Sequence, residues 1–324
     1  MEKLFQKISF GSATLVLIIL IGIFISLFIA AKPAMSEYGF NFIVNPVWNK
    51  EIVIENQKYQ VKPDETVNED DSVFENDFSD DDVIPMDDES NANSTTKIIY
   101  GGLVPIVGTV ASTIIALIFS LPIAMGIAIF LAEIAPANIS KVVGGAIELL
   151  AAIPSIIFGM WGLYYFAPLV ADVFGGFQVS LLTAGLVLGV MILPFMAAIT
   201  RDSMNTTPDV LKESAYALGA TKFEVIKDII FPYSKVGIIG SIILSLGRAL
   251  GETMAVAFLI GSIFQLPEKL TDPTISIPVA LANNFGEASG LGMNSLFYLA
   301  FILFVFSFAV ISFAKFYFLR KTHI

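Results

Sequence analysis

The sequence of 324 residues is 56% hydrophobic and only 15% charged, with a mean hydropathy of +0.78. A soluble domain carries about 25% charged residues, so these values exclude an ordinary soluble enzyme or binding domain. The chain has no cysteine, which excludes a disulfide framework, a thiolate metal site and a thiol nucleophile. Its formal net charge of −11 belongs to residues 32–97, which hold 16 acidic residues and five lysines, while the charges of the remaining chain cancel.

The first apolar segment lies near the N-terminus. Between Ile8 and Ala31 there are 24 residues without a charge, and a transmembrane helix needs about 20. We therefore predict that residues 1–31 form an N-terminal tail and the first transmembrane helix. A cleaved signal peptide is the alternative, because the run ends in small residues, but the apolar region of a signal peptide usually has only about 7–15 residues.

An acidic insertion follows at residues 32–97, with few aliphatic residues and a dense run of aspartate and glutamate. Such a composition cannot bury enough apolar surface to offset the entropy lost on ordering, so we predict an extracytoplasmic segment that is partly disordered. Weak alternation within residues 41–61 would allow a β-hairpin. A calcium loop is an alternative for the aspartates, but the EF-hand spacing with its central glycine is absent, which favours a solvated acidic insertion.

Five more apolar spans are predicted within residues 98–324. Residues 236–267 contain Arg248 and Glu252 as their only charges. Four other stretches contain no charge at all: 98–132, 149–171, 173–200 and 288–314. These stretches are apolar on all faces, as expected for helices in lipid. With the first span, they predict an all-α integral membrane protein of six transmembrane helices.

Lysine and arginine set the orientation of such a protein. With the N-terminus inside, the inner segments hold 11 basic residues, whereas the outer segments hold Lys269 and the five lysines of the acidic insertion. An even number of spans returns the C-terminus to the side of the N-terminus. We therefore predict cytoplasmic N- and C-termini, an outward-facing acidic insertion and a cytoplasmic loop at residues 201–235.

This cytoplasmic loop contains signals for two short helices. Thr207, Pro208 and Asp209 are typical of a helix N-terminus, and Gly219 suits a left-handed C-cap near residue 218. Thr221 begins a capping-box pattern for the second helix, which we expect to end before a proline.

Three apolar residues of the second helix are spaced to share one face: Phe223, Ile226 and Ile230. An apolar face on a cytoplasmic surface suggests insertion into a groove of a partner protein. The alternative is a packed loop between membrane helices, and the spacing alone leaves both interpretations open.

The same loop resembles the EAA loop of ABC-importer permeases, which reads Glu-Ala-Ala, three residues, Gly, nine residues, Ile, any residue, Leu, Pro. The matching positions are Glu213, Ala215, Gly219, Ile229 and Pro232. Ser214 and Phe231 depart mildly from the pattern. The resemblance implies that this coupling loop docks on a cytoplasmic ATPase subunit.

Two further stretches resemble the PstC-type permease family of phosphate importers: AAIPSIIFGMWGL at 151–163 and LGRALGETMAVAFLIG at 246–261. In the sister permease family the GET motif typically continues with Ala-Pro, whereas here Thr253 is followed by Met-Ala. The resemblance covers roughly residues 98–318 and the first span. The acidic insertion is longer than the family leads us to expect, and no function carries over to it.

The resemblance implies a type I (MetI-like) permease core at residues 98–324, in the bacterial inner membrane, that moves inorganic phosphate into the cytoplasm. Implied partners are a homologous second permease subunit, two cytoplasmic ATPase subunits and an extracytoplasmic phosphate-binding protein. The chain itself is then not an enzyme and holds no cofactor, because ATP-Mg binds the ATPase. Alternatives are a permease for another oxyanion, such as sulfate or molybdate, and a membrane scaffold or sensor of phosphate status.

The residues themselves point to Arg248 and Glu252 as a polar site. Arg248 lies about 20 Å past Lys235 at 1.5 Å per helical residue, and is thus near the bilayer centre, where a charge costs about 2.5–3.5 kcal/mol. Glu252 would stack on the same helix face four residues later and neutralise it. Because a guanidinium fork suits phosphate oxygens, we predict that both residues line the substrate pathway. A permanent structural ion pair is the alternative.

Other candidates carry less weight. Arg201 is a weaker candidate, for the exit of the pathway, and a positive-inside anchor is the favoured account of it. Glu133 and Glu148 are interpreted as interfacial rather than catalytic. Ser155 lacks a base, because the only histidine is His323. No glycine-rich phosphate loop is present, so we expect a partner to hydrolyse ATP.

Overall fold

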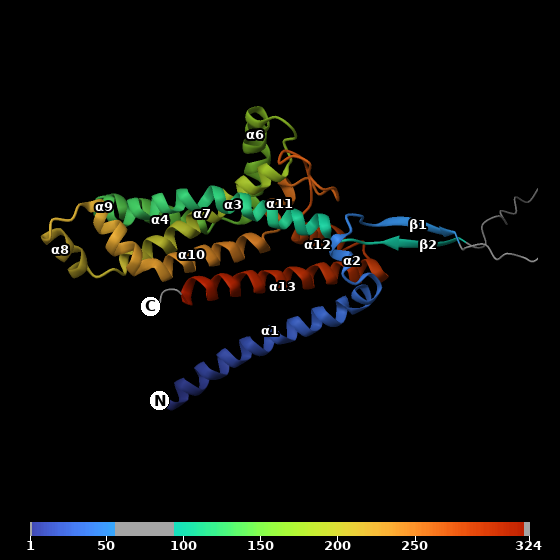
Figure 1. Ribbon diagram of the computed structural model, residues 1–324, viewed down its shortest axis with the longest axis horizontal. Coiled ribbons are helices and arrows are strands. Elements are labelled where there is room, and N and C mark those ends of the chain that lie inside the picture. Colours follow the sequence, from blue (N-terminus) through green and yellow to red (C-terminus); the bar gives the residue numbers. More distant parts are fainter. Residues whose placement is uncertain (1, 56–93, 321–324) are drawn as a thin grey trace, which may run out of the picture. The chain divides into compact units, whose positions relative to one another are not determined.

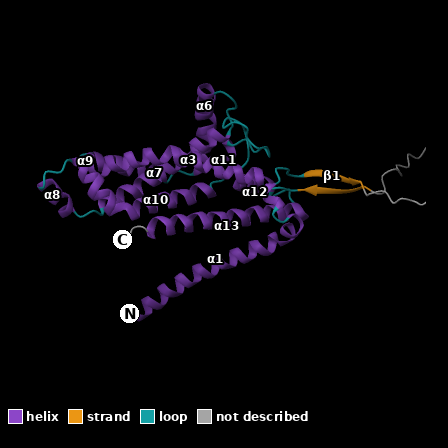
Figure 2. Ribbon diagram, viewed as in Figure 1, coloured by secondary structure: helices purple, strands orange, loops and turns teal. Residues whose placement is uncertain are grey.

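The structure of the protein is a computed structural model that describes residues 2–55 and 94–320. It divides into two compact units, one formed by Met1–Trp48 with Tyr100–Ile324 and the other by Asn49–Ile99. The first unit is almost entirely helical and the second contains the two strands (Figures 1 and 2). The predicted disorder of the acidic insertion falls mainly on residues 56–93, which lie outside the described residues.

The elements of the helical unit follow one another without any strand. In chain order they are α1 (Glu2–Tyr38), α2 (Asn41–Val44), α3 (Leu103–Ile129), the π-helical turn η1 (Phe130–Ile134), α4 (Ala137–Ala151), α5 (Ser155–Trp161), the π-helical turn η2 (Gly162–Phe166), α6 (Ala167–Phe174), α7 (Leu181–Asn205), α8 (Asp209–Ala217), α9 (Lys222–Val225), the π-helical turn η3 (Ile226–Ile230), α10 (Phe231–Gly251), α11 (Met254–Leu259), α12 (Ile277–Asn284) and α13 (Gly290–Arg320).

Six helical stretches of the described chain are long and apolar enough to cross a membrane, which confirms the predicted number of spans. Their bounds are Leu4–Tyr38, Leu103–Ile134, Ser155–Phe174, Leu181–Asn205, Lys222–Gly251 and Gly290–Phe316. Most of their apolar side chains face outward, as the surface of a lipid-embedded bundle requires.

Prolines act differently in two of the spans. Pro154 separates α4 from α5, so the third span begins at Ser155. Pro122, by contrast, lies inside the continuous helix α3. Transmembrane helices tolerate prolines because neighbouring groups satisfy the freed carbonyls.

The second unit is an antiparallel pair of β1 (Lys50–Glu55) and β2 (Ser94–Ile99), in which Lys50 lies opposite Ile99. The hairpin predicted within residues 41–61 therefore differs from the structure. Its first strand forms, but the partner strand comes from the end of the acidic insertion. The insertion is thus carried between the two strands of a β-ribbon. Residues 32–48, which the sequence assigns to the insertion, belong to the helical unit instead.

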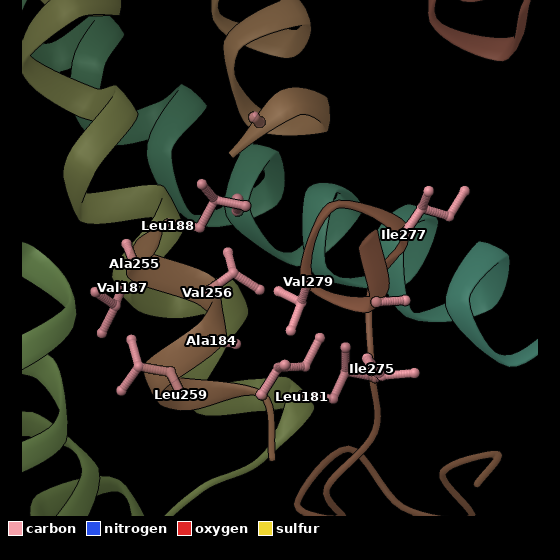
Figure 3. Close-up of a cluster of buried hydrophobic side chains, with 14 of the residues drawn as sticks. Leu181, Ala184, Val187, Leu188, Ala255, Val256, Leu259, Ile275, Ile277 and Val279 are labelled. Carbon is pink, nitrogen blue, oxygen red and sulfur yellow. The ribbon is translucent and has the colours of Figure 1, made fainter. Parts of the chain in front are cut away.

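The core of the helical unit lies around α7, which packs along α3 and contacts α10 and α11. Figure 3 shows side chains of α7 (Leu181, Val187, Leu188) meeting those of α11 (Val256, Leu259) and of the segment 275–279. α7 is accordingly the most buried of the six spans. The segment between α10 and α12 thus turns back and packs into the core.

α3 approaches this returning segment closely at Gly108. A Cβ atom at Gly108 would overlap the carbonyl group of Ile275, which is backbone and cannot rotate away. One residue later, the Thr109 hydroxyl accepts a hydrogen bond of 2.8 Å from the Ile277 N–H. The absence of a side chain at Gly108 therefore permits the contact between α3 and the segment 275–277.

We expect Gly108→Ala to lower the free energy of unfolding by about 1–3 kcal/mol, the usual cost of overpacking. Gly126→Ala is the matched control on the same helix, because no atom lies within 4 Å of its added methyl group, and it should stabilise by roughly 0.5–1 kcal/mol. The thermal midpoints of the purified proteins measure both effects. Equal midpoints for the two variants would contradict the close approach.

Candidate functional site

The predicted coupling loop forms α8 and α9, which lie at one end of the helical unit together with the N-terminal end of α1 and the C-terminal end of α13 (Figure 1). α8 ends before Gly219, whose φ of +87° is the left-handed conformation predicted for this C-cap. Thr207 does not cap α8, contrary to prediction. Pro208 occupies the N-cap position, and the buried Thr207 hydroxyl has no hydrogen-bond partner among the described residues.

The capping box of the second helix is formed as predicted. The Thr221 N–H donates to Glu224 Oε2 over 2.7 Å, and the Glu224 N–H donates to Thr221 Oγ1 over 3.4 Å. The Thr221 hydroxyl also donates to Glu224 Oε2 over 2.8 Å. Because these bonds satisfy N–H groups that the helix leaves free, they fix where α9 begins.

Thr221→Val should lower the free energy of local unfolding at the start of α9 by about 1 kcal/mol. This corresponds to roughly fivefold faster amide exchange in α9. Thr221→Ser retains the hydroxyl and is the control. Hydrogen-exchange mass spectrometry of a peptide covering residues 221–230 measures the difference. If the valine variant exchanges no faster than the serine variant, the capping box does not stabilise α9.

The second helix does not end before Pro232, and this part of the prediction is wrong. α9 continues through η3 into α10, with Pro232 in the first turn of α10, so the second short helix of the loop and the fifth span are one continuous helix. The π-helical turn adds a residue just before the proline and makes the hydrogen-bond ladder irregular there, which lets a helix absorb a proline.

The three apolar side chains that are predicted to share a face differ in burial. Phe223 is 71% exposed, Ile226 is half-buried and Ile230 is fully buried. They therefore do not form one exposed apolar surface on this helix.

The exposed surface of the loop is formed by both short helices. Glu213 and Gly219 of the motif are exposed, and so are the apolar residues Val210, Leu218 and Phe223, with Leu218 exposed to 90%. We call these five residues the loop surface. Below it lies a shallow pocket of about 360 Å³ between α8 and the start of the fifth span. An apolar surface with acidic side chains beside it, outside the apolar spans, is suited to binding a protein.

The other motif residues face inward or border the fifth span. Ala215 is buried in a small apolar cluster with Ala128, Met204, Val225 and Ile230. Ile229 packs against this cluster, whereas Pro232 is exposed. The motif thus contains both the surface of the loop and the contacts that hold it to the ends of α3, α7 and α10.

Two ion pairs that the sequence did not reveal hold this end of the unit together. Lys212 Nζ on α8 lies 2.7 Å from Glu133 Oε1 on η1, and Arg201 on α7 donates to Glu148 Oε1 on α4 over 2.8 Å. Arg201 also donates to Asp202 Oδ1 over 2.7 Å. The partners are 79 and 53 residues apart in sequence, so no spacing pattern indicates them.

These pairs give a structural role to Glu133 and Glu148, the two acidic residues interpreted as interfacial. The Arg201 side chain is only 12% exposed and packs over Gly144, so its structural role is to hold α4 against α7. That geometry favours an anchoring role for Arg201 over an exit residue of the pathway, and the pathway role stays a prediction.

Arg248 and Glu252 do not lie on one helix face, and the predicted four-residue stacking is wrong. α10 ends at Gly251, Glu252 has an extended backbone with ψ of 128°, and its Oε1 accepts the Ala255 N–H over 3.3 Å at the start of α11. Among the described residues no ion pair joins the two side chains. The fifth span is therefore interrupted between α10 and α11, because Glu252 caps the shorter helix instead of continuing the longer one.

Arg248 is half-buried, and its guanidinium carbon lies 5.6 Å from the ring centre of Phe195 on α7. This cation–π contact with the Phe195 ring is the interaction that the structure gives the guanidinium. In residues 2–55 and 94–320, no carboxylate forms an ion pair with it. Among the described residues, no acidic side chain accepts the guanidinium N–H groups. Such an arginine is able to receive an anion or a carboxylate from outside the described chain.

A larger pocket of about 720 Å³ lies away from the coupling loop, between residues 177–179 and residues 261–273. The returning loop around it is held by Asp272, whose Oδ2 accepts the N–H groups of Glu268 and Lys269. No group of three or more potential metal-ligating side chains occurs in the part of the chain that the structure describes.

Comparison with known proteins gives the same architecture. Residues 98–322 match the family model described as binding-protein-dependent transport system inner membrane component. A phosphate transport system permease protein PstC from Pasteurella multocida (strain Pm70) is 49% identical over 241 residues, 68% of this chain and 75% of that protein. PstC from Haemophilus influenzae is 39% identical over 324 residues, 94% of this chain and 89% of that protein.

A solved chain of the MetNI methionine ABC transporter in an inward-facing conformation aligns with a TM-score of 0.55. It covers 67% of this chain and 94% of its own length at 17% identity. At that identity the likeness carries the fold alone, a MetI-type permease bundle.

Proposed function

This chain belongs to the family of binding-protein-dependent transport system inner membrane components, and we propose that it is the permease subunit through which an ATP-driven importer moves inorganic phosphate into the cytoplasm. The observation that carries the proposal is the similarity to phosphate permeases across nearly the whole chain. The chain is an inner-membrane component of a transport system, and a subunit with this role catalyses no reaction of its own in our proposal.

The loop surface supports a partner that supplies the energy. It lies at the end of the bundle where charged residues are frequent, which is the cytoplasmic side by the distribution of lysine and arginine. On this orientation both termini are cytoplasmic. A cytoplasmic ATPase subunit that holds ATP-Mg docks on the loop surface, and a second ATPase subunit docks on the homologous second permease.

The continuous helix from α9 to α10 connects this docking site to the substrate pathway. Arg248 lies in the last turn of α10, and Glu252 follows at the point where the helix is interrupted. A push on α9 therefore moves Arg248 without any flexible segment between them. We assign phosphate binding during transit to Arg248, and the positioning of the helix break beside it to Glu252.

On the opposite side, the 720 Å³ pocket beside residues 261–273 is the surface available to an extracytoplasmic phosphate-binding protein. Its rim carries both apolar and polar side chains, including Phe177, Gln178 and Gln265. Such mixed surfaces suit a transient partner.

Transport by the purified complex tests the proposal. The complex, placed in lipid vesicles with ATP at the ATPase side and the phosphate-binding protein at the other, should accumulate labelled phosphate only while ATP is hydrolysed. Excess sulfate or molybdate should leave this uptake unchanged. Stronger accumulation of either competitor would make the anion assignment wrong, and no ATP-dependent accumulation of any anion would favour a scaffold or sensor.

A further inference from the structure

The Lys212–Glu133 ion pair joins α8 to the last turn of the second span, and both of its side chains are largely shielded from solvent. Its Nζ to Oε1 distance is 2.7 Å, and the Lys212 and Glu133 side chains are only 16% and 9% exposed. Surface ion pairs contribute little because water competes for both charges. Here water is largely excluded, so each charge depends on the other, and loss of one partner leaves a poorly solvated charge behind.

The pair belongs to the inner face of α8. Lys212 and Ala215 are three residues apart and point the same way, Lys212 toward η1 and Ala215 into the apolar cluster with Ala128. Glu213 and Leu218 are exposed on the loop surface. α8 therefore has an outer face available for docking and an inner face fastened to the bundle.

The other end of the pair lies at the end of the second span. Glu133 is in η1, the π-helical turn that directly continues α3. α3 packs closely along α7, because a Cβ at Gly189 would lie 3.0 Å from the Ala116 carbonyl oxygen. A displacement of Glu133 is thus passed to the core of the unit.

Among the charged groups near α8, the Lys212–Glu133 pair is the one that connects α8 to another element. Asp209 Oδ1 lies 3.9 Å from Lys212 Nζ, but Asp209 is on α8 itself and its side chain is 87% exposed. The other ion pair at this end, Arg201 with Glu148, joins α7 to α4 and includes no residue of α8. Among the described residues, only Lys212 forms an ion pair between α8 and another element.

We propose that the Lys212–Glu133 pair is a strut that transmits movement of α8 to the second span, in parallel with the covalent route through α9 and α10. This inference rests on the proposed function, and it makes Lys212 and Glu133 positioning residues that contact no substrate. When an ATPase moves α8, the strut moves α3 and α7 while the continuous helix moves α10. The two routes meet at Arg248, which lies on α10 and contacts Phe195 on α7.

The number of phosphate ions transported per ATP hydrolysed tests the strut. In vesicles holding the complete complex, Lys212→Met and Glu133→Gln should each lower this ratio about tenfold, within the usual range of coupling between sites, while the ATPase subunits stay bound. The exchanged pair Lys212→Glu with Glu133→Lys should recover most of the ratio. Lys141→Met is the matched control, since Lys141 is an exposed lysine of α4 and the ratio should not change.

Three results would overturn the strut. The ratio could stay at the wild-type value in both single variants, the exchanged pair could fail to recover it, or the single variants could lose their ATPase subunits in proportion to uptake. The last result would mean that the pair only fastens the fold.

A distance measurement separates this inference from the proposed function. The chain has no cysteine, so spin labels can be attached at Ser214→Cys on α8 and Asn138→Cys just beyond η1, in a complex whose partners carry no accessible cysteine. The wild-type distance distribution should be narrow with and without ATP and vanadate, whereas Lys212→Met should broaden it. If the wild-type complex transports no phosphate, the proposed function fails, and an unbroadened distribution in the variant independently refutes the strut.

Discussion

Arg248→Gln is expected to lower phosphate uptake by about 10–150-fold while the complex still folds and assembles. The magnitude corresponds to the loss of one hydrogen-bonded interaction with a charged group, about 1.5–3 kcal/mol. Stability should be retained because the guanidinium is half-buried, contacts the Phe195 ring and has no carboxylate partner among the described residues. Removing a charge from a membrane span also removes its insertion cost of about 2.5–3.5 kcal/mol. Uptake in vesicles and size-exclusion chromatography of the complex give the two readouts.

Two further variants make this prediction specific. Arg248→Lys retains the charge but loses the planar fork, so it should keep part of the uptake. Arg201→Gln should behave differently and lower the thermal midpoint, because Glu148 loses the partner that holds α4 against α7. Normal uptake by an assembled Arg248→Gln complex would show that Arg248 has no role in the pathway.

Leu218→Glu is expected to weaken ATPase binding at least about thirtyfold. Leu218 is 90% exposed at the end of α8, and a side chain that anchors the centre of an interface contributes about 2 kcal/mol or more. A carboxylate there would have to be desolvated on docking, beside the acidic Glu213 and Glu224 of the same loop. Co-purification of the ATPase subunits and titration of their binding to the membrane-bound permease measure the loss.

The control for this prediction is Leu270→Glu, which makes the same change at an exposed leucine of the returning loop. Its ATPase binding should equal that of the wild type, because Leu270 lies in the segment that packs beside the other end of α7. Unchanged ATPase binding in Leu218→Glu would remove Leu218 from the docking surface. A loss of binding in both variants would indicate general damage to the fold.

The number of spans and the helix-capping residues of the loop could be predicted because each leaves a local signal. Twenty apolar residues are needed to cross a bilayer whatever the neighbouring helices do. The Thr221–Glu224 capping box and the left-handed Gly219 are also set by residues a few positions apart. In each case the physical cause and the sequence signal lie in the same short segment.

The errors come from places where the backbone departs from regular helix. The predicted stacking of Arg248 and Glu252 assumes a continuous helix, but Glu252 caps α11 and the helix ends at Gly251. The predicted end of a helix before Pro232 assumes that proline terminates it, but η3 absorbs the proline. In both places the backbone can form alternative sets of hydrogen bonds, and the spacing of residues in the sequence does not indicate which set is more stable.

The sequence by itself thus determined that this chain has six helices able to cross a membrane and a loop of two short helices before the fifth of them, because hydrophobic length and helix caps are local properties. Only the tertiary structure decided which charges meet. Lys212 joins Glu133 and Arg201 joins Glu148 across 79 and 53 residues, while Arg248 faces an aromatic ring instead of the nearby Glu252. Such partners are chosen by how the helices pack, and a charge in a poorly solvated place takes whichever partner that packing brings within reach.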